Sequence, residues 1–130
     1  MSKRTIDVLI PDGYKLGAKE REAAWILANH YKTIVHILRP SKGYMEKTAD
    51  FLIDNERYEL KTPTSPQVRT IEKHIRLATK QSENVIIDSR KTKITEKRMT
   101  EICIDRLAHI KKLRKIVLIV DKKKVLDFSK

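Results

Sequence analysis

The chain has little of what marks a membrane, disulfide-rich or zinc-binding protein. Its one cysteine, Cys103, allows no intramolecular disulfide, and it falls in an apolar helical stripe that predicts a core position. No apolar run approaches the roughly 20 residues of a membrane span. The apolar stretch 6–10 is short and is interrupted by Asp7, so we expect no signal peptide. We therefore expect a cytoplasmic protein that acts inside the cell and has no membrane partner.

Aromatic residues and metal-ligand patterns are also scarce. Aromatic residues make up 5% of the chain, and most of them fit core positions, so stacking of bases on exposed rings is not evident. None of the four histidines has a His or Cys partner at metal-ligand spacing, which argues against a zinc site.

Acidic residues are outnumbered, 17 against 29 basic ones, which gives a net charge of +12. The basic excess is concentrated between Ser89 and Lys115 and in Lys122–Lys124. Such an asymmetry predicts a polyanionic partner, most often a nucleic acid. The alternatives are a solubilising surface and a basic helix on a membrane surface. An acidic inhibitor protein is compatible with nucleic-acid binding.

Periodic patterns predict an α+β fold, with a mixed, largely antiparallel sheet of about five to seven strands packed with three helices. The length of 130 residues, without repeat or linker, fits a single domain over residues 1–130. Five consecutive apolar residues predict a central strand covered on both faces at 116–120. The predicted helices cover 18–31, 70–80 and part of 94–110; the strands cover 6–10, 33–38, 49–53, 57–61, 83–87, 116–120 and 125–128; turns fall at 11–13 and 40–43.

Two acids and a lysine on one predicted hairpin are the first candidate site. A tight turn at Asp54–Asn55 places Asp50 opposite Glu59, where two carboxylates repel unless a cation is near. Lys61 lies two residues beyond Glu59 and on the same strand face. This spacing, with the order helix, three strands, helix, strand, fits the PD-(D/E)xK nucleases, in which two carboxylates hold a divalent cation. An exposed strand with an ordinary ion pair has the same pattern.

Polar residues next to this hairpin and around the following strand extend the candidate site. The segment after Lys61 carries hydroxyl groups that can bind a phosphate, with Thr70 as a possible helix cap. Arg90 and Lys91 follow a buried strand and could stabilise phosphate charge. Histidine is the usual base of metal-free RNA cleavage. The further candidates are Thr62, Thr64 and Ser65 in the loop, Gln81, Asn84 and Asp88 around the strand, and His36 and His74 as bases.

Three runs, 49–63, 70–75 and 81–88, resemble the C-terminal tRNase domain of the CdiA contact-dependent inhibition toxins. Stand-alone relatives of that family occur in phages and integrative mobile elements. The resemblance covers a toxin-like core at 48–128, after a helical lead-in at 1–47. It implies a barnase/EndoU/colicin/RelE-like fold, metal-independent cleavage of RNA, commonly tRNA, and a cognate immunity protein. It places Lys61 and Glu59 at the active site, with the elements 81–84 and 88–90 beside it.

Three functions follow from these residues. In a ribonuclease without a cofactor, a base removes the 2′-OH proton and that oxygen attacks phosphorus, while Lys61 and Arg90 stabilise the developing charge; Glu59 and Thr62 complete the catalytic set. Gln81, Asn84, Asp88, Thr64 and Lys91 then bind the substrate. In the alternative, Asp50 and Glu59 hold Mg²⁺ and water attacks. The third function is non-catalytic binding of a nucleic acid or a protein partner.

Overall fold

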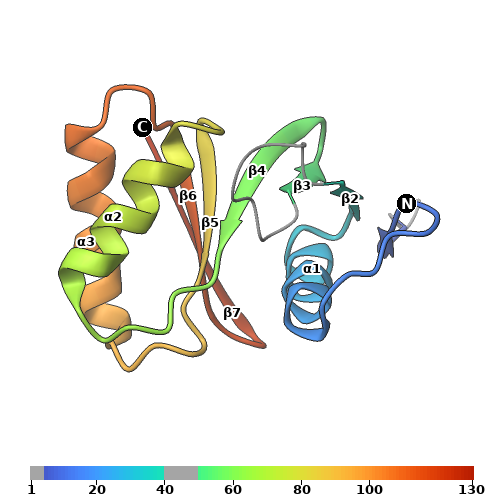
Figure 1. Ribbon diagram of the computed structural model, residues 1–130, viewed down its shortest axis with the longest axis horizontal. Helices are drawn as coiled ribbons and strands as arrows, with labels where there is room; N and C mark the ends of the chain where they lie inside the picture. Colours follow the sequence, from blue (N-terminus) through green and yellow to red (C-terminus); the bar gives the residue numbers. More distant parts are fainter. Residues whose placement is uncertain (1–4, 40–49) are drawn as a thin grey trace. The chain divides into compact units, whose positions relative to one another are not determined.

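The computed structural model describes residues 5–39 and 50–130 and has an α+β fold with a mixed sheet, as predicted (Figure 1). The turn predicted at 40–43 and the first residue of the strand predicted at 49–53 lie outside the described residues. The helices are α1 (Ala18–Tyr31), α2 (Val68–Thr79) and α3 (Glu96–His109). The strands are β1 (Asp7–Leu9), β2 (Ile34–Leu38), β3 (Asp50–Ile53), β4 (Glu56–Lys61), β5 (Asn84–Asp88), β6 (Lys115–Asp121) and β7 (Lys124–Ser129).

The chain divides into two compact units, Met1–Tyr58 and Glu59–Lys130. In the first unit, β1 pairs in parallel with β2, and β2 pairs antiparallel with β3. The α1 helix packs on β1 and β2 through its apolar stripe, which includes Ala23, Ala24 and Leu27. Trp25 lies within α1 but outside this stripe, and it is 40% exposed.

The Asp54–Asn55 turn is a tight two-residue connection between β3 and β4, as predicted. Both residues have positive φ values, 49° and 65°. This combination defines the type I′ turn, whose twist matches that of the flanking strands. Asp and Asn tolerate the left-handed region better than other residues with a side chain, which explains why this turn forms here.

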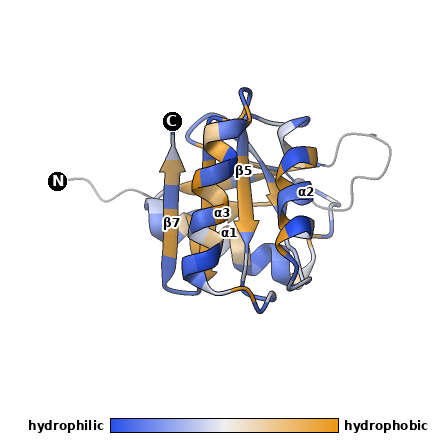
Figure 2. Ribbon diagram, turned by 90° about the vertical axis from the view of Figure 1, so that its left-hand side faces the viewer, coloured by the Kyte–Doolittle hydropathy of each residue, from blue (hydrophilic) through white to orange (hydrophobic). Residues whose placement is uncertain are grey.

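The second unit is built on β5, β6 and β7. The β5–β6 pairing is parallel, and the β6–β7 pairing is antiparallel. Helices α2 and α3 lie together on one side of these strands (Figure 1). Their apolar stripes, which include Ile71, Ile75 and Met99, pack against β5 and β6 and bury Cys103 as predicted. Figure 2 shows β5 as an apolar strand, and residues 116–119 of β6 are fully buried, as expected of a central strand.

The two helices of this unit begin differently. The α2 helix starts at Val68, two residues before the predicted start, and its N-cap Gln67 makes no side-chain cap. Thr70 therefore lies inside the first turn, and its prediction as a cap was wrong. The α3 helix has a side-chain cap, because the Thr95 hydroxyl accepts a hydrogen bond from the Arg98 backbone N–H. Among the helices of the described residues, none has the length and apolar content needed to span a membrane.

Candidate functional site

The carboxyl end of β4 brings Glu59 and Lys61 together. Alternate residues of a strand share a face, so both side chains point to the same side. The distance from Lys61 Nζ to Glu59 Oε1 is 3.7 Å. The Glu59 side chain is 1% exposed and that of Lys61 is 25% exposed. A buried carboxylate is costly without a cation, and Lys61 supplies one while it keeps access to solvent.

Asp50 in the first unit has a different cation, Arg57. Arg57 Nε donates to Asp50 Oδ2 at 2.7 Å, and Nη2 contacts the same oxygen. The other oxygen, Oδ1, is buried and has no hydrogen-bond partner among residues 5–39 and 50–130. The sequence predictions proposed Lys61 or a metal as the cation and missed Arg57. Arg57 lies on β4 two residues before Glu59, and alternate residues of a strand share a face. This spacing could have identified Arg57 from the sequence.

Two loops of the second unit meet where the candidate site continues. The Thr92 hydroxyl, after β5, donates to the Ser65 backbone oxygen, after β4, at 2.7 Å. The Ser65 hydroxyl accepts from the Gln67 backbone N–H at 3.1 Å, which shapes the approach to α2. Within this loop Thr62 is half-buried and Thr64 is exposed. The candidates after β4 and those after β5 therefore belong to the same end of this unit (Figure 1).

Arg90 lies at this end, but Asp88 holds its guanidinium. Arg90 Nε donates to Asp88 Oδ1 at 2.8 Å, and Nη2 donates to Oδ2 at 2.7 Å. Such a bidentate pair fixes the planar guanidinium in one orientation. The Arg90 side chain is 16% exposed, whereas Lys91 belongs to the exposed residues. Asp88 thus contacts Arg90, and its predicted role in binding substrate stays a prediction.

The candidates before β5 lie elsewhere. Asn84 begins β5 and Asp88 ends it. The two are four positions apart along an extended strand, which separates them by about 13 Å. Gln81 is exposed in the turn before the strand. The structure therefore separates the two elements around β5, which the resemblance had placed beside one site.

His74 and His109 both belong to the unit that contains Lys61, and His74 is the one that the sequence predicts as a base. It is half-buried on α2. Burial lowers the pKa of its imidazole, and the charges of Lys61 and Lys73 lower it further. A neutral imidazole beside a lysine could act as a base. His36 is exposed on β2 of the first unit.

No group of three or more His, Cys, Asp or Glu side chains in the described ranges could hold a metal ion. The magnesium alternative requires fewer protein ligands, because Mg²⁺ keeps several waters and often binds only one or two carboxylates. The buried Asp50 Oδ1 has the chemistry of such a ligand. Asp50 and Glu59, the residues of the magnesium alternative, therefore offer the carboxylate oxygens that Mg²⁺ prefers as ligands.

Comparison with protein families gives a match over residues 47–125 to the contact-dependent growth inhibition CdiA C-terminal domain. The chain belongs to this family. The matched region begins one residue before the predicted toxin-like core and includes Asp50, Glu59, Lys61, His74 and Arg90. A search among curated proteins finds no match.

The fold of this CdiA C-terminal toxin domain is also found in a solved structure. A chain of the CdiA-CT/CdiI toxin and immunity complex from Burkholderia pseudomallei is similar to it with a TM-score of 0.67 and 14% identity. The similarity covers 95% of this chain and 99% of that chain. At this identity the similarity establishes the fold. It extends to residues before position 47, where the family match does not reach.

Proposed function

We propose that this chain is a nuclease toxin that cleaves a phosphodiester backbone at the carboxyl end of β4. The pairing of a buried Glu59 carboxylate with a solvent-accessible Lys61 carries the proposal. Cleavage builds negative charge on phosphorus-bound oxygens, and a lysine placed beforehand stabilises that charge. The net charge of +12 favours a polyanionic substrate.

The order of elements and the buried acids support a metal-dependent mechanism. The sequence α1, β2, β3, β4, α2, β5 is the order of helix, three strands, helix and strand that the PD-(D/E)xK nucleases use. The two carboxylates of this alternative, Glu59 and Asp50, each carry a buried oxygen of the hard type that Mg²⁺ prefers. Bound Mg²⁺ would lower the pKa of a water molecule and polarise the phosphate. Lys61 would orient the nucleophile, and Arg57 holds the Asp50 carboxylate in position.

The lowered pKa of His74 favours the metal-free ribonuclease as a second candidate. His74 would take the proton of the 2′-OH, and the freed oxygen would attack phosphorus. The bond from phosphorus to the 5′-oxygen would break, the 5′-oxygen would take up a proton from water, and a 2′,3′-cyclic phosphate would remain. Lys61 would stabilise the charge in this mechanism too. RNA is then the required substrate, and tRNA is the form that the family resemblance predicts.

The decisive experiment incubates the protein with total tRNA, and separately with DNA, in EDTA and in magnesium. We expect cleavage only with magnesium, and a loss of at least about 100-fold in rate for Lys61→Ala and for Asp50→Asn. The matched control Lys122→Ala, in an exposed turn, should cleave normally.

Other outcomes separate the alternatives. Cleavage of RNA in EDTA that persists in Asp50→Asn and is lost in His74→Ala would establish the metal-free mechanism. Full activity of Lys61→Ala would exclude the β4 site. No cleavage in either buffer, with tRNA still bound, would support the non-catalytic function.

We also propose that an acidic immunity protein neutralises the toxin in the cytoplasm. The family and the complex in which the similar chain was solved support a partner of this kind. The basic surface predicts that the partner is acidic and that binding weakens with salt. Inhibition of cleavage by a candidate partner, measured at low and high salt, tests this proposal.

A further inference from the structure

Four cations follow one another along the exposed face of α2: Arg69, Lys73, Arg76 and Lys80, the last at the C-cap. They are spaced four, three and four residues apart, which places them on one side of a helix. All four are exposed. The row extends over about 16 Å, since each helical residue rises 1.5 Å.

Two adjoining cavities follow this row. The first, of about 380 Å³, is lined by Arg69, Lys73 and Arg76 together with Glu72 and Arg106. The second, of about 290 Å³, is lined by basic residues that include Lys80 and Lys111. Arg76 lines both cavities, so they are neighbours on the same side of α2. We call this surface the α2 groove and define it by Arg69, Lys73, Arg76, Lys80, Lys111 and Lys112.

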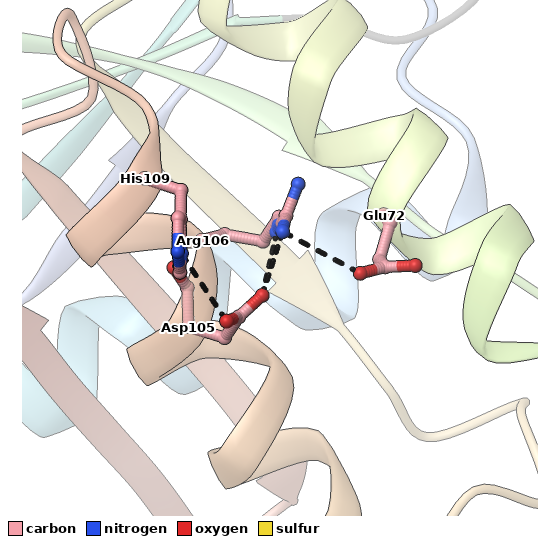
Figure 3. A network of polar contacts seen from close by, with 4 residues as sticks. All are labelled: Glu72, Asp105, Arg106 and His109. Atoms are coloured by element: carbon pink, nitrogen blue, oxygen red, sulfur yellow. Dashed lines mark hydrogen bonds and ion pairs between the residues drawn. The ribbon is translucent and has the colours of Figure 1, made fainter.

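The acidic side chains near the α2 groove, Glu72 and Asp105, form ion pairs with Arg106, which is not one of the six groove cations. Figure 3 shows Arg106 between two carboxylates: its Nη2 lies 2.6 Å from Asp105 Oδ2 and 3.7 Å from Glu72 Oε2. The same Asp105 contacts His109 Nδ1 at 3.2 Å. Within residues 5–39 and 50–130, the six cations of the α2 groove have no ion-pair partner. Their positive charge is therefore available to a ligand.

The α2 groove lies on the helix that follows the β4 site in the chain. Residues 62–67 connect Lys61 at the end of β4 to Val68 at the start of α2, so Arg69 is the groove residue nearest to Lys61 along the chain. The charges of Lys61 and Lys73 both lower the pKa of His74. Lys111 and Lys112 extend the positive surface at the other end, beside the end of α2.

We propose that the α2 groove binds the phosphate backbone of the nucleic-acid substrate. This inference rests on the proposed nuclease function and adds a binding surface to its catalytic end. Lysine and arginine in a row are suited to repeated phosphates. A protein partner would instead favour aromatic or apolar anchors, and among the residues that line the two cavities Ile110 is the one large apolar side chain.

The experiment measures binding apart from cleavage, in EDTA and in a Lys61→Ala background. The groove variant is Arg69→Gln, Lys73→Gln, Arg76→Gln. The matched control, Lys97→Gln, Lys122→Gln, Lys123→Gln, removes the same charge from exposed positions outside the groove. Fluorescence anisotropy gives the affinity of each for labelled tRNA and for polyglutamate between about 50 and 200 mM salt.

We expect the groove variant to bind tRNA at least about tenfold more weakly, with a slope of log affinity against log salt smaller by about three. The control should stay within about twofold of the parent. Equal weakening of both variants would show that net charge alone binds the nucleic acid and would overturn the proposal. Loss of polyglutamate binding with tRNA binding retained would overturn it in favour of an acidic protein.

Two readouts keep these outcomes separate from misfolding and from failure of the proposed function. Thermal unfolding followed by circular dichroism should match between the groove variant and the control, and Arg76→Gln alone should give a smaller loss in the same direction. If the chain proves not to cleave, the binding comparison still stands. If it cleaves, the groove variant should raise KM and leave kcat nearly unchanged.

Discussion

His74 reports on the charge around the β4 site. Three effects lower the pKa of its imidazole: burial, the Lys61 charge and the Lys73 charge, in decreasing order. A protonated imidazole would be repelled by both lysines, so His74 favours the neutral form at a pH where an exposed histidine is already partly charged.

We therefore expect NMR titration to place the pKa of His74 below the ordinary value of about 6.5. Lys61→Ala should raise it toward that value, because the substitution removes a positive charge. Lys122→Ala, in the turn after β6, is the matched control and should leave it unchanged. A pKa that does not respond to Lys61→Ala would separate His74 from the lysine and weaken its assignment as a base.

The same shift makes stability depend on pH. Because the pKa of His74 is lower in the folded chain than in the unfolded chain, the unfolded chain binds the proton more readily between the two values. This contribution to stability is fully present above about pH 6.5 and is lost as the pH falls through the folded value. As the pH falls through this range, the free energy of unfolding in urea should therefore decrease more for the parent than for His74→Gln.

At the scale of elements, strong periodicity made the sequence informative. The helix predicted at 18–31 has these bounds in the structure. The five apolar residues predicted as a central strand at 116–120 lie in β6, and four of them, 116–119, are fully buried. The start of α2 was missed because its N-cap, Gln67, makes no side-chain cap. The cations of the α2 groove do not form a continuous basic run in the sequence. They lie three and four residues apart, and only a helix brings such residues onto one face.

The Thr95 hydroxyl caps the first turn of α3. Thr95→Ala removes the hydroxyl that accepts from the Arg98 N–H, so the free energy of unfolding should fall by about 1 kcal/mol. Thr95→Ser keeps the hydroxyl and should cost much less. Urea denaturation of both variants measures the difference; equal losses would show that the methyl group, and not the cap, stabilises this helix.

At the scale of the whole molecule, the net charge of +12 opposes the compact state through self-repulsion. Salt screens this repulsion, since the Debye length falls from about 30 Å at 0.01 M to about 8 Å at 0.15 M. We expect Tm to rise by roughly 2–5 °C over this range, which corresponds to about 1 kcal/mol. A fall in Tm would show that the surface ion pairs outweigh the repulsion.

Cys103 is fully buried in the α2–α3 core, and burial raises the pKa of its thiol to about 12. The thiolate is the reactive form, so the folded molecule should resist alkylation at neutral pH. A thiol reagent would then react only with molecules whose second unit has opened. The rate of labelling therefore measures how often the second unit opens. This measurement does not depend on whether the toxin is catalytically active.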